Sequence, residues 1–217
     1  HPTHTRACTF FSKVAGPQAD HQSLALGVEA AWRGPKKALA SAMNVFWSNG
    51  YKATSLGDLT GAMKISKSSM YETFGSKHDL FLSTIEYYIR TVTTQISGAA
   101  HIDAPAVKVI RALFHRAVQR MAEPNSRRGC YLNNCAVEVS VRDSEAGERV
   151  EKGLDMMEEA FFSLVQRGQR EGDISTRHDP RSMARFLVSS LNGILVMGKA
   201  HASTDKLNDV VDITVNA

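Results

Sequence analysis

The stretch Thr54–Leu80, TSLGDLTGAMKISKSSMYETFGSKHDL, contains no long apolar run, yet its helix-start signals recur at a regular spacing. Ser55 is followed three residues later by Asp58, and Ser76 is followed in the same way by Asp79. A serine with an acidic residue at this spacing is a capping box, in which each side chain bonds the other residue's backbone amide. The pattern therefore predicts that one helix starts after Ser55 and another after Ser76.

A further short helix fits between the two capping boxes, from Ser66 to Gly75. The tight turn Met63–Ser66 joins it to the preceding helix, which makes a helix-turn-helix arrangement. The major groove of DNA admits one α-helix, and a recognition helix reads base edges with its N-terminal residues. The polar residues that this helix offers are Lys67, Ser68, Ser69, Tyr71 and Thr73. We therefore expect the segment to bind DNA.

The distribution of charge supports a polyanionic partner for this part of the chain only. The net charge of the whole chain is +4. Residues 33–90 hold eight Lys and Arg residues against four Asp and Glu residues, whereas the segments on either side are each balanced. An excess of positive charge confined to one segment is typical of binding to nucleic acid, although charge alone would also fit a solvated basic face.

From Lys36 to Ile89 the sequence resembles the TetR/AcrR-type bacterial transcriptional regulators. The residues that carry the resemblance are Phe46, Gly50-Tyr51, Ala53-Thr54-Ser55, Asp58-Leu59, Ile65-Ser66-Lys67, Met70-Tyr71, Phe74-Gly75-Ser76-Lys77 and Leu80. The pattern is long, gapless and specific. It implies a three-helix DNA-binding unit at the N-terminus, followed by a helical body that binds a small ligand and dimerises.

The resemblance also implies individual roles in DNA binding. The residues expected to face bases are Lys67, Ser68, Ser69 and Thr73. The residues expected to hold phosphates are Ser55, Tyr71 and Lys77. Thr54 and Lys36 are further DNA-binding candidates, with Lys36 in a short basic arm before the first helix. Lys64 stands at the turn position that the family usually fills with Gly, and a left-handed lysine costs roughly 1 kcal/mol.

Helical periodicity continues along the rest of the chain, and no strand pattern competes with it. We expect an all-α protein with three parts: a poorly structured arm over 1–32, a helix-turn-helix domain over 33–79 and a ligand-binding and dimerisation domain over 80–217. A helix is expected over Tyr131–Val141. The helix Arg181–Lys199 is the best dimerisation candidate because small and polar residues interrupt its wide apolar arc, with a central core helix as the alternative.

The effector pocket is expected among the helices between Ile85 and Val165. Candidate lining residues are Phe114, His115, Val118, Tyr131, Cys135, Met157 and Phe161. Most of these are aromatic or apolar residues at helical spacing, which equally fits a packed core.

Two of the three cysteines, Cys130 and Cys135, follow Arg127-Arg128 near an expected helix start. Both features lower a thiol pKa and favour the reactive thiolate, so Cys130 is a candidate redox or electrophile sensor. The alternative is that both cysteines are small buried hydrophobes. The odd count suits a reducing cytoplasm, and no spacing typical of a metal site is present.

No enzyme motif, cofactor fingerprint or membrane-length apolar run is present in the sequence. The sequence therefore predicts a cytoplasmic regulator without enzymatic activity, cofactor, metal or membrane partner. We expect a homodimeric repressor of a near-palindromic double-stranded DNA operator, released when a small molecule tilts the helix that begins at Ser76. Sensing through the thiol of Cys130 is the alternative.

Overall fold

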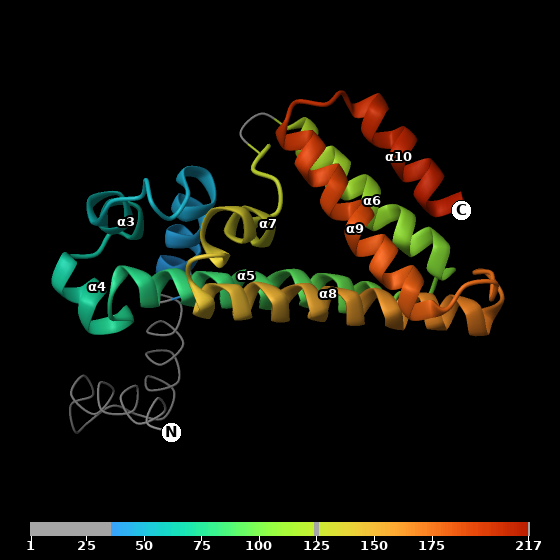
Figure 1. Ribbon diagram of the computed structural model, residues 1–217, viewed down its shortest axis with the longest axis horizontal. Helices are drawn as coiled ribbons and strands as arrows, with labels where there is room; N and C mark the ends of the chain where they lie inside the picture. Colours follow the sequence, from blue (N-terminus) through green and yellow to red (C-terminus); the bar gives the residue numbers. More distant parts are fainter. Residues whose placement is uncertain (1–35, 124–125, 217) are drawn as a thin grey trace, which may run out of the picture.

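A computed structural model describes residues 36–123 and 126–216. The predicted arm over 1–32 lies outside these ranges. Within them every regular element is helical, which confirms the predicted all-α fold (Figure 1).

The N-terminal head consists of a helix over 36–49, α3 (Leu56–Met63) and α4 (Lys67–Phe74). Both predicted capping boxes are confirmed, Ser55 with Asp58 at α3 and Ser76 with Asp79 at the next helix. The turn between α3 and α4 passes through Lys64 at φ 56° and ψ 44°, the left-handed conformation expected there. Ser55, Ser66 and Ser76 cap α3, α4 and α5, so local signals in the sequence set the starts of these three helices.

The body is built from five long helices and one short, irregular segment. The long helices are α5 (Lys77–Ala99), α6 (Ala106–Ala122), α8 (Ser144–Glu171), α9 (Pro180–Lys199) and α10 (Thr204–Asn216). The side chain of Asp143 caps α8 and that of Asp179 caps α9. The predicted boundary between head and body falls in the first turn of α5, which both parts share.

The helix predicted over Tyr131–Val141 is split. An α-helical turn, α7 (Tyr131–Cys135), runs directly into a π-helical turn, η1 (Ala136–Ser140). The segment is rich in β-branched valines, which lose side-chain freedom in an α-helix, so local preference for a regular helix is weak.

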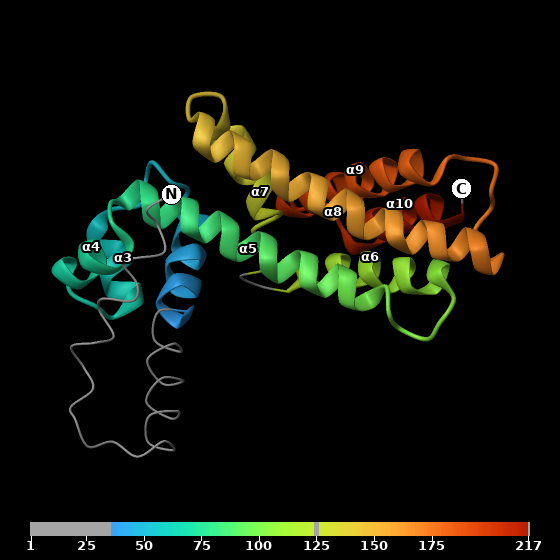
Figure 2. The same cartoon turned by 90° about the horizontal axis from the view of Figure 1, so that it is seen from below.

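The helices form an elongated molecule with the head at one end. α5 packs along α8, and α9 packs against both α8 and α6, while α10 covers α6 and α9. Figures 1 and 2 show the head at the N-terminal end of α5 and the layer of α6, α9 and α10 toward its other end. Phe81 on α5 joins head to body, because its ring lies 5.2 Å from that of Phe46 and 4.5 Å from that of Tyr51.

Candidate functional site

α4 has one anchored face and one exposed face. Met70 is fully buried, and Phe74 packs partly buried against the core. The five residues predicted to contact DNA from this helix are all exposed: Lys67, Ser68, Ser69, Tyr71 and Thr73. All five side chains are thus accessible to solvent, over a wide arc of this short helix.

The start of α4 is organised by its own serines. The Ser66 side chain accepts a hydrogen bond from the Ser69 amide at 3.1 Å, and the Ser66 hydroxyl lies 2.8 Å from that of Ser68 and 2.9 Å from that of Ser69. These hydroxyls remain exposed, so they can exchange partners with a ligand at the surface. A helix N-terminus with free donors also attracts phosphate groups.

The other residues predicted to contact DNA differ in their exposure to solvent. Lys36 and Ser55 are exposed, and Lys77 lies half-buried with its Nζ 4.6 Å above the Tyr51 ring. Thr54 differs from the prediction: it is only 2% exposed, and its hydroxyl donates to the Gly50 carbonyl at 2.6 Å. Thr54 therefore closes the turn after the helix 36–49, and its side chain does not face solvent.

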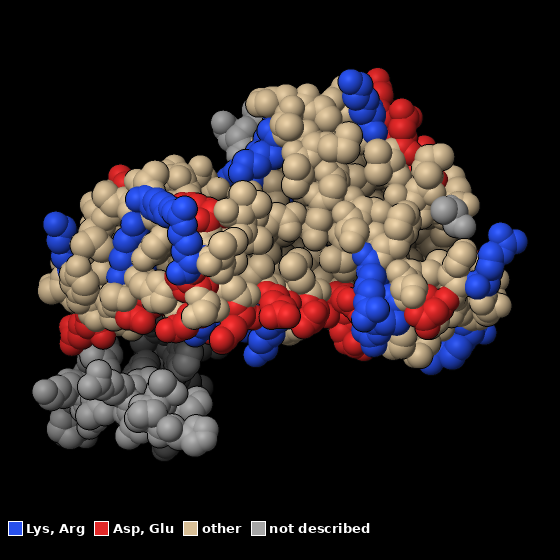
Figure 3. Space-filling model, viewed as in Figure 1, with Lys and Arg blue, Asp and Glu red and all other residues tan. Residues whose placement is uncertain are grey.

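The head carries a concentration of basic side chains on the face shown in Figure 3, whereas acidic side chains gather along the edge formed by α5 and α8. Two carboxylates of the head are held in capping boxes. Hydrogen bonds from Ser55 lower the pKa of Asp58, and those from Ser76 lower the pKa of Asp79. Both groups are therefore ionised at neutral pH and stabilise helix starts.

The head and the body meet at a joint made by η1, which the sequence does not indicate. The Glu138 carboxylate accepts hydrogen bonds from the backbone amides of Tyr51 at 3.0 Å and Lys52 at 2.9 Å. Gly50 has φ +83°, and a Cβ there would lie 2.7 Å from the Glu138 carboxylate. Nearby, His78 Nε2 lies 2.8 Å from Asp143 Oδ2.

A second part of the joint is centred on Trp47, in the helix 36–49. Its Nε1 donates to the Arg128 carbonyl at 3.2 Å, and the Arg128 guanidinium lies 4.3 Å from the centre of its ring. Arg128 also donates to Asn44 at 2.9 Å. The segment after α6 is thereby attached to the first helix of the head.

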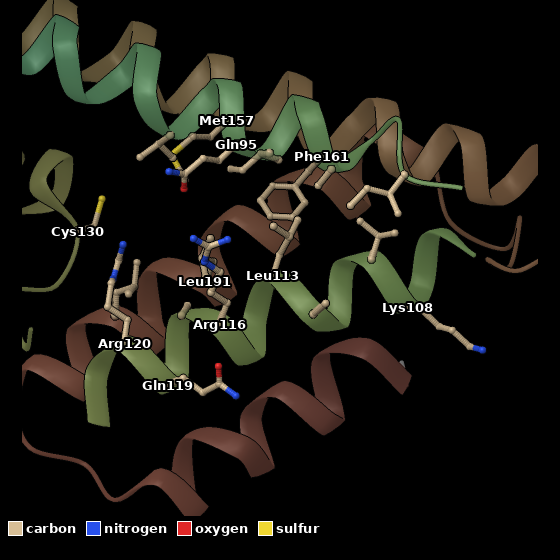
Figure 4. Close-up of a pocket in the computed structure, with 18 of the residues that line it drawn as sticks. Gln95, Lys108, Leu113, Arg116, Gln119, Arg120, Cys130, Met157, Phe161 and Leu191 are labelled. Atoms are coloured by element: carbon tan, nitrogen blue, oxygen red, sulfur yellow. The ribbon is translucent and has the colours of Figure 1, made fainter. Parts of the chain in front are cut away.

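A pocket of about 790 Å³ lies in the body between α5, α6, α8 and α9 (Figure 4). Its apolar wall includes Val92, Ile96, Leu113, Leu191 and Leu195. Its polar lining consists of Tyr88, Gln95, Lys108, Arg116, Gln119, Arg120, Glu123 and Cys130. The charged and amide side chains come from faces of α5 and α6 that resemble ordinary solvated faces in the sequence.

Only part of the predicted pocket lining is present in this pocket. Of the seven candidates, Met157 and Phe161 line it; Cys130, predicted only as a redox sensor, lines it as well. Five other candidates do not: Phe114, His115, Val118, Tyr131 and Cys135. Phe114 is fully buried and packs against the Phe161 ring at 6.2 Å, so it supports the pocket wall from behind.

The environment of the two cysteines matches the alternative of two small buried side chains and differs from that expected of a reactive thiolate. Both are buried and free. Burial raises the pKa of Cys135 to about 12, the opposite of the expected lowering. The two arginines do not act on the thiols as expected, since Arg127 donates to the Met121 carbonyl at 2.9 Å and Arg128 stacks on Trp47. Cys130 Sγ accepts a hydrogen bond from the Tyr88 hydroxyl at 3.6 Å.

α9 has one apolar face buried in the core and a second, exposed face with apolar and small residues. Leu187, Leu191, Ile194 and Leu195 are buried in the body core. On the other side Phe186 is 51% exposed and Val196 is 56% exposed, with an exposed Gly193 between them that has open space beyond it. An apolar exposed stripe of this kind is typical of a surface that packs against another helix.

Within residues 36–123 and 126–216 the metal-ligating side chains are dispersed. No cluster of three or more His, Cys, Asp or Glu side chains there could hold a metal ion. None of the helices in these ranges is both long and apolar enough to cross a membrane.

An exposed polar helix behind a tight turn, carried by a three-helix head, defines a helix-turn-helix DNA-binding protein. Comparison with known protein families agrees. Residues 38–84 match the model of bacterial regulatory proteins of the tetR family, and residues 106–213 match the tetracyclin repressor-like C-terminal domain.

Individual relatives support the same assignment. The chain is 30% identical over 179 residues to the HTH-type transcriptional regulator YezE of Bacillus subtilis (strain 168), covering 82% of this chain and 92% of that protein. It is 25% identical to the HTH-type transcriptional repressor ComR of Escherichia coli (strain K12), covering 82% and 85%. The chain therefore belongs to the TetR family of bacterial transcriptional regulators and is not an enzyme.

A solved structure extends the comparison to DNA. A cysteine mutant of the TetR family regulator CifR, complexed with 26-base-pair operator DNA, matches with a TM-score of 0.69 at 28% identity, covering 84% of this chain and 95% of that chain.

Proposed function

We propose that this protein is a homodimeric repressor that binds a near-palindromic operator and is released by a small molecule bound in its body. The observation that carries the proposal is the exposed polar face of α4, held by Met70 on a basic head. Similarity to a repressor and to a regulator complexed with operator DNA supports it. Repression of genes would place the protein in the cytoplasm.

Dimerisation follows from the size of the reading surface. One short recognition helix contacts few bases, and two heads related by a twofold axis read two half-sites. The exposed stripe of α9, with Phe186 and Val196 on either side of Gly193, is our proposed interface. α8 packs alongside α9. Two such helix pairs would form a four-helix bundle across the interface.

Release of DNA would act through α5. This helix starts at the head, where Leu80 and Phe81 are buried, and continues to the pocket, which Val92 and Ile96 line. A ligand that prefers one tilt of α5 would therefore change the spacing of the two heads. A preference of a few kcal/mol for the non-binding spacing suffices to shift the population.

The proposal is tested by titrating the protein against the DNA just upstream of its own gene at two salt concentrations. We expect tight binding that weakens steeply with salt, because released counterions drive association. A shuffled DNA of the same composition is the control. Equal affinity for both DNAs, in the absence of any preferred site in a genome-wide selection, would rule out an operator-specific function.

Thiol sensing at Cys130 is a second candidate because Cys130 lines the pocket and accepts a hydrogen bond from Tyr88. A molecule bound in the pocket would reach the Cys130 sulfur without unfolding the body. The test is release of DNA by N-ethylmaleimide in the native protein and in Cys130→Ser. Release by the reagent that disappears in the variant supports thiol sensing, whereas identical behaviour of the two proteins excludes it.

A further inference from the structure

The body pocket has an excess of positive charge. Lys108, Arg116 and Arg120 line it, and Glu123 is the single acidic residue among its lining residues. Arg116 and Arg120 form no hydrogen bond or ion pair with other residues in the described part of the chain, and the buried Nε of Arg120 has no hydrogen-bond partner. Arg116 is exposed and Arg120 is partly buried. Because a buried polar nitrogen without a partner is costly, the buried Nε of Arg120 favours an anion bound beside it.

The other partly buried arginines in the described part of the body have polar partners, which makes Arg120 exceptional, whereas Arg116 is exposed. Arg149 bonds Glu86 at 3.1 Å, and Arg181 bonds Glu159 at 2.7 Å. Arg111, on the same helix as the pocket arginines, bonds Asp212 at 2.8 Å. The fold thus provides carboxylates for these three partly buried arginines but none for Arg120 in the described part of the chain.

The pocket is also divided into a polar end and an apolar end. In Figure 4 the side chains of Arg116 and Arg120 extend from α6 toward α5, where Gln95 approaches them, and Cys130 lies at the same end. Leu113 and Phe161 lie farther along the pocket, away from Cys130. The ligand that matches this lining carries a negative charge at one end and an apolar body at the other.

We propose that the effector is an amphipathic carboxylate, whose anionic group binds Arg116 and Arg120 while its apolar part lies against Leu113 and Phe161. The inference rests on the proposed function, because it assigns a chemical class to the ligand of the same pocket. A planar guanidinium matches the two oxygens of a carboxylate, and such charge-assisted bonds are about twice as strong as neutral ones.

The position of Arg120 also connects this ligand to the head. The Arg120 guanidinium lies 5.9 Å from the centre of the Trp47 ring, and Trp47 belongs to the first helix of the head. A carboxylate that draws Arg120 further into the pocket alters the surroundings of Trp47 directly. A ligand bound at the polar end would therefore affect the head through Arg120 and Trp47, in addition to any tilt of α5.

The experiment compares acids with their uncharged counterparts. Hexanoate, octanoate and 4-phenylbutyrate, each paired with its own primary amide, are titrated into the full chain by calorimetry. We expect at least one acid to bind about tenfold to a hundredfold more tightly than its amide, the range that one charged hydrogen-bonding contact contributes. Equal binding of acid and amide, or no binding of any acid, overturns the inference.

Variants locate the effect. Arg120→Met is expected to remove the preference for the acid while leaving the affinity for the amide unchanged, and Arg120→Lys to retain part of the preference. Arg90→Met is the matched control, since Arg90 is exposed on α5 outside the pocket. If Arg120→Met binds the acid as tightly as the wild type, the assignment is wrong. DNA binding, measured separately, decides the proposed function: a protein that binds its operator but prefers no acid refutes only the ligand class.

Discussion

The recognition helix and the body pocket are built in opposite ways. The exposed face of α4 comes from one continuous segment, Lys67–Phe74, and its anchoring residues alternate with its polar ones. The pocket is lined from α5, α6, α8 and α9 together with Cys130, with residues from Tyr88 to Leu195. A function carried by one helix is thus readable locally, whereas a cavity between helices depends on packing between distant segments.

The joint is where the two regions meet, and it combines both modes of construction. Glu138 belongs to the body but bonds the amides of Tyr51 and Lys52 in the head. Trp47 belongs to the head but contacts two arginines of the body: Arg120, which lines the pocket, and Arg128, which follows α6. Substitutions in the head, the joint and the turn therefore separate local from non-local contributions to stability and DNA binding.

The largest effect is expected on α4. Replacing Lys67 and Tyr71 together by Ala should weaken DNA binding by more than about a hundredfold, because each contact contributes about 1–3 kcal/mol. Both side chains are exposed, so the free energy of unfolding should change by less than about 0.5 kcal/mol. Fluorescence anisotropy with labelled operator and urea denaturation measure the two quantities.

The control for that change is Lys152→Ala, which removes an exposed lysine from α8 in the body. It should leave specific DNA binding nearly unaltered. Retention of tight binding by the double variant would mean that a surface other than α4 reads DNA, and the local picture of the head would fail.

The second effect tests the joint. Glu138→Ala should lower the free energy of unfolding by about 1–3 kcal/mol, since two backbone amides lose a charged acceptor. Hydrogen exchange at Tyr51 and Lys52 should accelerate. Glu145→Ala is the matched control, because Glu145 forms only an exposed contact of 3.6 Å with Arg149 on its own helix, worth at most about 0.5 kcal/mol. Indistinguishable exchange in the two variants would show that η1 does not hold the head.

The third effect concerns the turn of the helix-turn-helix. Lys64→Gly should raise the free energy of unfolding by about 0.5–1 kcal/mol, because glycine adopts φ 56° without the steric cost that a lysine side chain incurs. The same substitution at Lys152, inside α8, should lower it by about 1 kcal/mol. Chemical denaturation of both variants checks the opposite signs, and a loss of stability at Lys64 would contradict the assigned conformation.

The smallest effect is a pH dependence of the capping boxes. Because the pKa of Asp79 is lowered on folding, its contribution to stability is present above its unfolded pKa of about 3.9 and is lost as pH falls through the folded value. Ser76→Ala removes the capping hydroxyl and should cost about 0.5 kcal/mol at neutral pH, with less dependence on pH in the acid range. Ser83→Ala, which removes a hydroxyl bonded only to the Asp79 carbonyl, should keep the wild-type acid profile.

Much of the head could be predicted from the sequence, and the reason is visible in particular residues. Ser55, Ser66 and Ser76 each cap a helix through bonds that span three residues. Thr54 is the exception, because its bond to the Gly50 carbonyl buries a hydroxyl that the family pattern had suggested for DNA. The hydrogen bond that buries Thr54 spans only four residues, but it forms only because the turn brings the two groups together.

The pocket could be predicted only in part. Met157 and Phe161 line it, whereas Phe114 and Val118, on the same apolar face of α6, are packed into the core. The distinguishing residues are Arg116 and Arg120, whose spacing on α6 resembles that of a solvated face. Helical periodicity shows which residues share a face, but not whether that face meets solvent, core or cavity.

The sequence by itself determined most of the helices, their caps, the left-handed turn at Lys64 and the polar face of α4, since these depend on hydrogen bonds and steric preferences within a few residues. The tertiary structure alone decided the joint at Glu138, the burial that raises the Cys135 pKa and the arginine-lined pocket. Each of these joins residues far apart in the chain, and the free energy of such contacts depends on desolvation and on partners that only packing brings together.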